Sequence, residues 1–153
     1  MQTRNLLAPE AVIPRLDVTS KKQALQELSA YAAGVTNLSE RQIFDALLER
    51  ERLGTTGIGR GVAIPHSNFE GLEKIIGVFA RLPEPIDFDA PDNEPVDLIF
   101  LLLVPREADA DHLHALARVS RLFRHEEARA ELRACTDGKA LYGCLTRDGA
   151  DRA

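Results

Sequence analysis

The residues best suited to chemistry lie in one segment, Thr55 to Asn68, which reads TTGIGRGVAIPHSN. A glycine-rich turn leads there into a short apolar run and then into Pro65 and His66, and the chain contains only four histidines. A neutral imidazole is a good nucleophile near pH 7, because its ordinary pKa is about 6.5. The imidazole of His66 is therefore able to attack a phosphoryl group and carry it as a phosphoramidate.

A histidine that carries phosphate needs donors for the phosphoryl oxygens and a ring that is held in place. The turn offers candidates for both. Gly57 and the glycines that follow it leave backbone N–H groups unobstructed, so that these groups can converge on an anion. Thr55 and Thr56 add hydroxyl donors, and Pro65 fixes the backbone one residue before His66.

Arg50, near the end of the preceding predicted helix, is a candidate cation for the phosphate. The glycine spacing alone does not identify a nucleotide site, because GIGRG lacks both the GK[ST] of a Walker loop and the GxGxxG of a dinucleotide fingerprint. The residue types thus leave two interpretations of His66 open. It is either a phosphate carrier or an ordinary surface histidine at the end of a structural turn.

The other histidines are sorted by helical geometry. His112 and His114 lie in a predicted helix, where residues two apart point about 200° apart, so both cannot bind one metal ion from the same face. His112 falls on the apolar stripe and His114 on the opposite side. His112 is therefore either a structural core histidine or a functional one, whereas we interpret His114 and His125 as surface residues. The apolar stripe consists of Leu113, Leu116, Val119 and Phe123.

Several classes of function find little support in the composition and motifs. The net charge is -5 and the basic residues are scattered, which disfavours nucleic-acid binding. We expect no metal or other cofactor, because the chain has no CxxC, no HExxH and no three-ligand cluster. The absence of GxSxG argues against nucleophilic hydrolysis. No apolar stretch approaches the ~20 residues of a membrane helix, and no signal peptide is apparent, so we expect a cytoplasmic protein without membrane insertion.

The predicted elements form one α/β domain over residues 1–153. In chain order they are a strand at 11–18, helices at 20–34 and 39–54, strands at 61–66, 74–82 and 97–105, and helices at 111–123, 126–135 and 137–145. Ser20 and Ser39 each precede a glutamine by three residues, which predicts helix N-caps. The run at 97–105 has almost no polar alternation, which predicts a central strand covered on both faces. Helices must then lie on both sides of a mixed sheet, and residues from about 146 to 153 form a loose tail.

A longer segment, LLERERLGTTGIGRGVAIPH, closely resembles the active-site segment of the enzyme IIA domains of the phosphoenolpyruvate-dependent phosphotransferase system, of the mannitol/fructose type. The segments FDAPDNEPVDLIFLLLVP and HLHALARVSRLF are most similar to the nitrogen-related branch, whose free-standing members have regulatory duties. The resemblance runs from about Leu6 to Leu145. It implies a three-layer α/β/α sandwich around a mixed sheet.

The resemblance also implies roles for individual residues. His66 matches the histidine that accepts the phosphoryl group, on Nε2, from an HPr-like carrier of the nitrogen branch. His112 and Arg50 match the supporting histidine and arginine of the family. Ser67 is a departure, because the family commonly has glycine after the acceptor, and a serine there either restricts the backbone or adds a hydroxyl donor for the phosphate.

Three functions are compatible with these residues. The first is a phosphorelay intermediate, rather than a free-standing turnover enzyme, which takes phosphate on His66 and controls regulatory target proteins by its phosphorylation state. The second is a sugar-specific IIA component that passes phosphate to a separate IIB partner. The third is an interaction module without catalytic activity. Transfer to a IIB protein distinguishes the second from the first, and labelling of His66 excludes the third.

Overall fold

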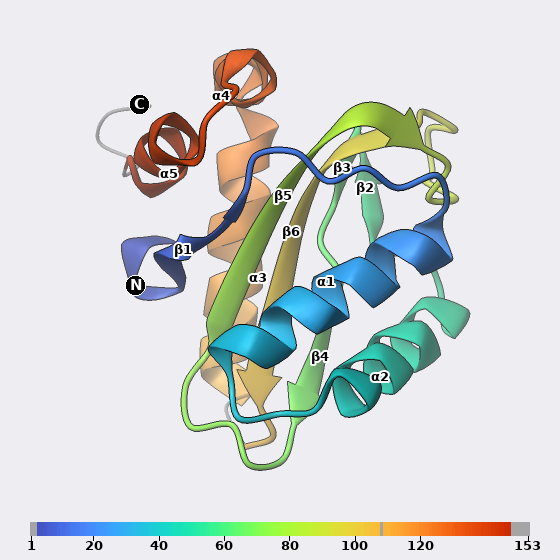
Figure 1. Cartoon of the computed structure of the whole chain (residues 1–153), viewed down its shortest axis with the longest axis vertical. Helices are drawn as coiled ribbons and strands as arrows, with labels where there is room; N and C mark the ends of the chain where they lie inside the picture. The colour runs from blue at the N-terminus through green and yellow to red at the C-terminus, as the bar shows by residue number, and fades with distance from the viewer. Residues whose placement is uncertain (1–2, 108, 148–153) are drawn as a thin grey trace.

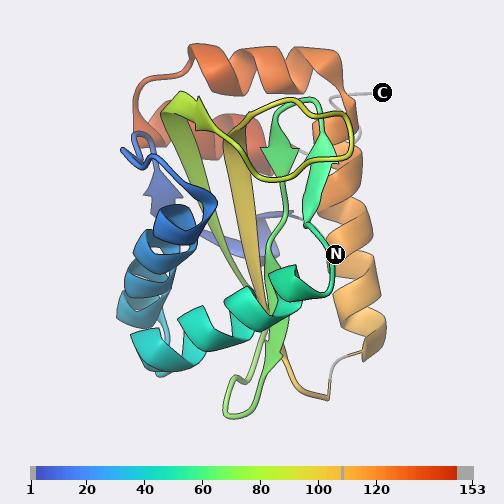
Figure 2. The ribbon, with the colours of Figure 1, turned by 90° about the vertical axis from the view of Figure 1, so that its right-hand side faces the viewer.

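One mixed β-sheet carries the fold, with helices on both of its faces (Figures 1 and 2). The computed structural model describes residues 3–107 and 109–147, apart from the side chains of Arg4, Asp109, Asp111 and His112. The strands are β1 (Leu7–Ile13), β2 (Gly57–Gly59), β3 (Val62–Ala63), β4 (His66–Phe69), β5 (Ile76–Ile86) and β6 (Val96–Pro105). They follow the order β1-β5-β6-β3-β2, and β4 also pairs with β6.

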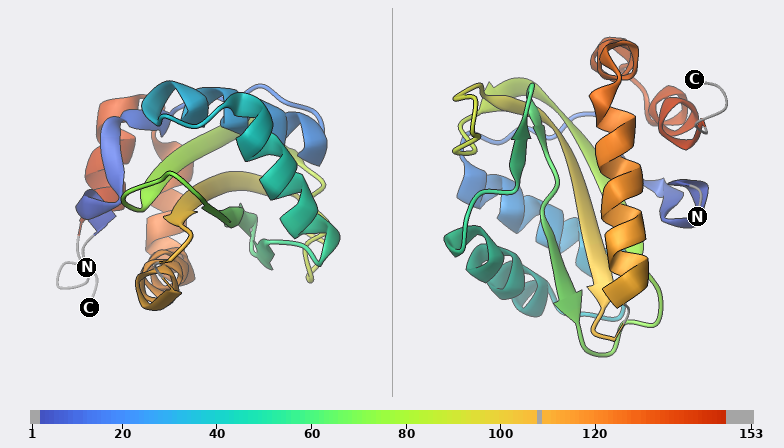
Figure 3. Two further views of the ribbon diagram at one scale, coloured as in Figure 1. Left: turned by 90° about the horizontal axis from the view of Figure 1, so that it is seen from below. Right: turned by 180° about the vertical axis from the view of Figure 1, so that it is seen from behind.

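The helices form the two outer layers of the predicted three-layer α/β/α sandwich, which is confirmed. They are α1 (Lys21–Val35), α2 (Glu40–Arg52), α3 (Asp109–Arg124), α4 (Glu126–Ala134) and α5 (Gly138–Thr146), and a short 3-10 helix, η1 (Thr3–Asn5), precedes β1. Helices α1 and α2 cover one face of the sheet, and α3 lies on the other (Figure 3). Among the helices of the described residues, none has both the length and the apolar character needed to cross a membrane.

Strand β6 is the central strand that the sequence predicts. It pairs antiparallel with β5 on one side and parallel with β3 and β4 on the other. Every residue from Leu98 to Val104 is buried, because helices cover both faces of the sheet at this strand. The rings of Phe79, Phe100 and Phe123 join β5, β6 and α3, with ring centroids 6.3 to 6.4 Å apart.

The predicted helix starts are confirmed at Ser20 and Ser39. Each serine side chain accepts a hydrogen bond from the backbone N–H three residues later, at 3.1 Å. Gly34, which was expected to end the first helix, lies inside α1, which continues to Val35. A Cβ at this position would meet nothing within 4 Å, so packing does not require glycine there.

Several predicted strands have different bounds in the structure. The strand expected at 74–82 is β5, which runs from Ile76 to Ile86. The strand expected at 61–66 is divided into β3 and β4, because Pro65 has no N–H to donate to the ladder; its carbonyl still accepts from Leu102 N–H at 2.9 Å. The strand expected at 11–18 is β1, which begins earlier, where Leu7 pairs with Gly77 of β5, and ends at Ile13, before Pro14. At the chain end, Thr146 still belongs to α5, and residues 148–153 of the predicted tail lie outside the described residues.

The apolar stripe of α3 is shifted from its predicted position. Val119 and Phe123 are buried as expected, but Leu113 is 67% exposed. At 100° per residue Leu113 lies about 120° around the helix from Val119, whereas Ala115 lies within about 40° of it and is buried. His114 is exposed as predicted, and His125 is half-buried at the N-cap of α4.

Candidate functional site

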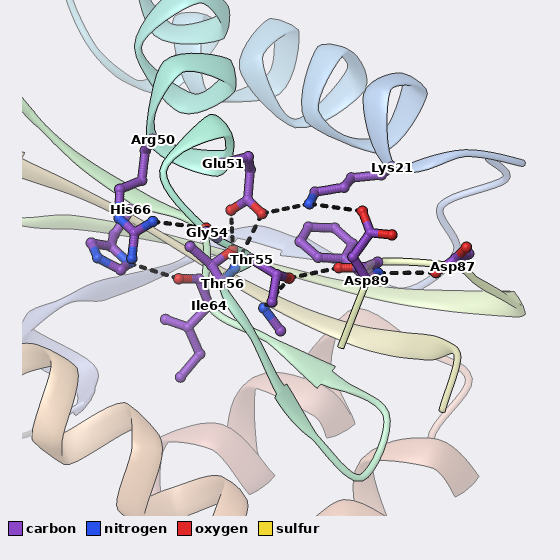
Figure 4. A network of polar contacts seen from close by, with 12 residues as sticks. Lys21, Arg50, Glu51, Gly54, Thr55, Thr56, Ile64, His66, Asp87 and Asp89 are labelled. Carbon is purple, nitrogen blue, oxygen red and sulfur yellow. Dashed lines mark hydrogen bonds and ion pairs between the residues drawn. The ribbon is translucent and has the colours of Figure 1, made fainter. Parts of the chain in front are cut away.

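His66 is positioned by its place at the start of a strand and by a backbone hydrogen bond to its ring. It opens β4 directly after Pro65 and is in register with Leu102 of β6. The ring is half-buried, and Nδ1 lies 2.8 Å from the carbonyl oxygen of Ile64 (Figure 4). A carbonyl oxygen only accepts, so Nδ1 carries the proton and the lone pair of the neutral ring is on Nε2. This hydrogen bond therefore makes Nε2 the nucleophilic nitrogen.

The surroundings of His66 keep its ring neutral at pH 7. Burial lowers the pKa of His66 below its ordinary value of 6.5, and the positive charge of Arg50 lowers it further. The hydrogen bond to Ile64 and the negative charge of Glu51 raise the pKa but do not reverse the net direction. A neutral imidazole is the form that attacks phosphorus, so the site favours the reactive form.

Arg50 supplies a cation beside the ring. It lies in the last turn of α2, and its Nη1 donates to the carbonyl oxygen of Gly54 at 2.9 Å. Figure 4 shows the guanidinium next to the His66 ring. A guanidinium has five N–H donors in a planar fork, and the bond to Gly54 uses one of them. The arrangement therefore allows Arg50 to bind the backbone and an anion at His66 together.

The three predicted phosphate donors in the turn form hydrogen bonds with protein groups. The Thr55 hydroxyl donates to the carbonyl oxygen of Phe88 at 2.6 Å, and the Gly57 N–H donates to Thr55 Oγ1 at 3.0 Å. The Thr56 N–H donates to Glu51 Oε1 at 3.1 Å, and its hydroxyl donates to Glu51 Oε2. In this structure these groups hold the shape of the turn rather than point together into an open anion site.

The two remaining predicted site residues lie on different elements. Ser67 follows His66 in β4 and is half-buried. Because side chains alternate along a strand, Ser67 is directed to the opposite face of the sheet from His66. The backbone of His112 lies in α3, near its N-terminus, and the side chain of His112 lies outside the described part of the structure.

The sequence interpretation missed a buried carboxylate next to Arg50. The side chain of Glu51 is only 4% exposed, and its Oε1 lies 2.8 Å from Nζ of Lys21, the first residue of α1. The sequence of α2 indicates this burial, because Ile43, Leu47 and Glu51 are spaced four residues apart and so lie on one face of the helix. All three are buried in the structure. A charged residue on an apolar stripe indicates a buried, partnered group.

The site as described is a nucleophile with a neighbouring cation. Nε2 of His66 holds the lone pair, and Arg50 can offset negative charge on an incoming phosphoryl group. Within the part of the chain that the structure describes, no three His, Cys, Asp or Glu side chains form a group that could hold a metal ion. The arrangement suits covalent transfer to a histidine.

Residues 5–147 match the family described as "Phosphoenolpyruvate-dependent sugar phosphotransferase system, EIIA 2". A nitrogen regulatory protein from Bradyrhizobium diazoefficiens is 57% identical over 145 residues, which is 95% of each chain. The crystal structure of the nitrogen regulatory protein IIA-Ntr from Neisseria meningitidis superposes with a TM-score of 0.88 at 37% identity, over 93% of this chain and 97% of that one. A fructose-specific EIIA component from Haloferax volcanii is 41% identical over 114 residues, or 74% of each chain.

Proposed function

Because the chain belongs to the EIIA 2 family of the phosphoenolpyruvate-dependent sugar phosphotransferase system, we propose that it carries a phosphoryl group on His66. The donor is an HPr-like phosphocarrier of the nitrogen branch, and the phosphorylation state of His66 controls binding to regulatory target proteins. The observation that carries this proposal is the hydrogen bond between Nδ1 of His66 and the Ile64 carbonyl, which leaves the lone pair on Nε2.

The transfer step follows from this tautomer. The lone pair of Nε2 attacks phosphorus, and an N–P bond forms as the bond between phosphorus and the carrier breaks. The electron pair of the broken bond leaves with the carrier, which takes up a proton. The Nδ1 proton of His66 stays hydrogen-bonded to the Ile64 carbonyl, so the acceptor needs no separate base.

The residues around His66 have supporting roles in this proposal. Arg50 offsets the charge of the phosphoryl oxygens, and His112 is a second supporting group by family resemblance. The segment from Thr55 to Gly57 keeps the turn in shape through its bonds to Phe88 and Glu51. Ser67 influences the backbone after the acceptor, since its side chain is directed to the other face of the sheet.

Regulation is favoured over sugar transfer by the likeness to the nitrogen regulatory protein from Bradyrhizobium diazoefficiens, at 57% identity over 95% of each chain. A phosphoryl group adds up to about two negative charges at one point of the surface. On a chain of net charge -5, this change can create or remove a docking surface for a partner. The targets that respond are therefore proteins that distinguish the two forms by charge near His66.

A sugar-specific role is the second candidate, and the likeness to the fructose-specific EIIA component from Haloferax volcanii favours it. In that role the phosphoryl group moves onward from His66 to a IIB protein. Incubation of the labelled chain with IIB proteins separates the two candidates, because a regulator keeps its label and a transport component loses it.

Intact-mass spectrometry tests the main proposal. The chain and a His66→Ala variant are incubated with phosphoenolpyruvate, enzyme I and an HPr-like carrier of the nitrogen branch. We expect an acid-labile gain of one phosphoryl group (about 80 Da) in the wild-type chain and none in the variant. Equal labelling of the two proteins excludes His66 as the acceptor. The absence of label in the presence of a demonstrably phosphorylated carrier contradicts the phosphocarrier role.

A further inference from the structure

We propose that Glu51 and Lys21 are positioning residues for His66, which act through Thr56 and Ile64 to fix the ring in the tautomer with its lone pair on Nε2. This inference rests on the proposed role of His66 as the phosphoryl carrier. The negative charge of Glu51 also raises the pKa of His66, but the positioning effect is a separate one. The positioning effect passes along hydrogen bonds between four segments of the protein (Figure 4).

The first link is the buried carboxylate of Glu51. Its Oε1 accepts from Lys21 Nζ at 2.8 Å and from the Thr56 N–H at 3.1 Å, and its Oε2 accepts from the Thr56 hydroxyl. The side chains of Glu51 and Lys21 are 4% and 20% exposed. Charge-assisted bonds in a site closed to water are strong and directional, so the carboxylate holds Thr56 in one place.

The second link runs from Thr56 to the ring. The Ile64 N–H donates to the Thr56 carbonyl oxygen at 3.0 Å, and the carbonyl oxygen of Ile64 lies 2.8 Å from His66 Nδ1. The backbone of Ile64 is thus bonded to Thr56 through its N–H and to the His66 ring through its carbonyl oxygen. A displacement of Thr56 therefore moves the acceptor that determines which nitrogen of His66 carries the proton.

The third link fastens the same turn to the loop after β5. Lys21 Nζ also lies 3.5 Å from Asp89 Oδ2 and 4.9 Å from the centroid of the Phe88 ring. The Thr55 hydroxyl donates to the Phe88 carbonyl oxygen at 2.6 Å. The ammonium of Lys21 therefore joins α1, the end of α2 and this loop, and the turn that leads to His66 is fixed from two directions.

Stability alone does not account for a charged pair at this position. A buried ion pair is commonly no better for stability than apolar residues of similar volume, because both charges must be desolvated. Ile43 and Leu47 precede Glu51 on the same stripe, so an apolar residue would continue the core. What an apolar residue cannot do is accept hydrogen bonds from Thr56. The ion pair of Glu51 and Lys21 is thus suited to holding Thr56 in position, while Arg50, the residue before Glu51, lies beside the His66 ring.

Glu51→Gln is the main test, with Glu49→Gln as the matched control. Both variants lose one negative charge from α2, but the side chain of Glu49 is 68% exposed and pairs only with Arg52 among the contacts described. We expect Glu51→Gln to slow phosphoryl acceptance by about tenfold to a hundredfold, since small misplacements of a reacting group have effects of that size. Its ¹⁵N imidazole spectrum should show a mixture of His66 tautomers, and Glu49→Gln should match the wild type in both measurements.

A second pair of variants keeps the test decisive if Glu51→Gln does not fold. Thr56→Val removes only the hydroxyl donor to Glu51, and Thr56→Ser restores it. We expect the tautomer mixture and the slow transfer in Thr56→Val, and recovery of both in Thr56→Ser. Folded variants that keep the single Nδ1-protonated tautomer and the wild-type rate overturn the inference. The spectrum needs no phosphocarrier, so it tests the positioning even if the wild-type chain takes no label and the proposed function fails.

Discussion

The carbonyl oxygen of Ile64 lies 2.8 Å from Nδ1 of His66, so a backbone group two residues before the histidine determines its tautomer. Pro65 stands between the two residues and restricts the backbone that joins them. The position of Pro65 explains why residues 61–66 do not form one continuous strand but are divided into β3 and β4. The break at Pro65 turns the Ile64 carbonyl toward the ring instead of toward a neighbouring strand.

The titration of His66 should be displaced to low pH. Because burial and Arg50 lower its pKa, we expect an NMR titration of the imidazole to have its midpoint below 6.5. The titration of His66 should then leave the rate of phosphoryl acceptance unchanged from pH 6.5 to about 8. The rate should fall only at lower pH, where the ring becomes protonated. A midpoint above 6.5 would contradict the neutral nucleophile.

The same shift has a consequence for stability. The folded pKa of His66 is below the unfolded value, so in the range between the two the unfolded chain binds more protons. The contribution of His66 to the free energy of unfolding is therefore unaffected above about pH 7 and becomes unfavourable as the pH falls below 6.5. The wild-type chain should therefore lose stability as the pH falls from 6.5 to the folded pKa of His66, and the His66→Gln variant should lose less. Urea denaturation of both proteins at several pH values measures this difference.

Arg50→Gln should raise the pKa of His66 and slow phosphorylation. The variant removes a positive charge that lowers the pKa, and it removes the donor that we propose for the phosphoryl oxygens. We expect the rate of acceptance to fall by about a hundredfold, measured with the phosphorylated carrier in excess. Arg52→Gln is the control, because Arg52 is in the same helix turn but is exposed and pairs with Glu49. An equal effect of the two variants would assign the result to net charge rather than to Arg50.

Gly61→Ala should destabilise the protein. Gly61 has a φ of +81°, and a Cβ there would collide with the guanidinium of Arg133 and lie 2.9 Å from Asp97 Oδ1. Arg133 and Asp97 form a two-nitrogen ion pair between α4 and β6 that would have to move. We expect a loss of about 1 to 3 kcal/mol in the free energy of unfolding by urea denaturation.

Gly34→Ala is the matched substitution for this measurement. A Cβ at Gly34 meets nothing within 4 Å, and the residue lies in α1. Alanine there should leave the stability unchanged or increase it by up to about 1 kcal/mol. If Gly61→Ala is as stable as Gly34→Ala, the contact between Gly61 and the Arg133 guanidinium does not constrain the turn.

Local sequence signals predicted the parts of the fold that depend on local contacts. The N-caps at Ser20 and Ser39 involve residues three positions apart, so the sequence alone contains both partners of each bond. The limits of β1 could not be found in this way. They depend on pairing with β5, whose residue Gly77 is seventy positions after Leu7. The residues of β1 alone do not contain the information that specifies this pairing.

The site shows the same division between local and distant contacts. His66 and Arg50 were predicted as partners, and the structure places them side by side in Figure 4. The contact of Glu51 with Lys21 was missed, because it joins the start of α1 to the end of α2 and forms only when the two helices pack. The burial of Glu51, in contrast, could have been read from its spacing after Leu47.

Replacement of the ion pair by apolar residues should separate stability from function. Lys21→Met alone leaves the buried Glu51 carboxylate without its cation, and we expect it to cost about 3 kcal/mol in the free energy of unfolding. The double variant Lys21→Met/Glu51→Leu has no unpaired charge and extends the apolar stripe of α2, so it should be more stable than Lys21→Met in urea denaturation. Its leucine still cannot accept from Thr56, and the double variant should therefore accept phosphate slowly despite its recovered stability. A double variant with both wild-type stability and the wild-type rate would show that the pair only fills space.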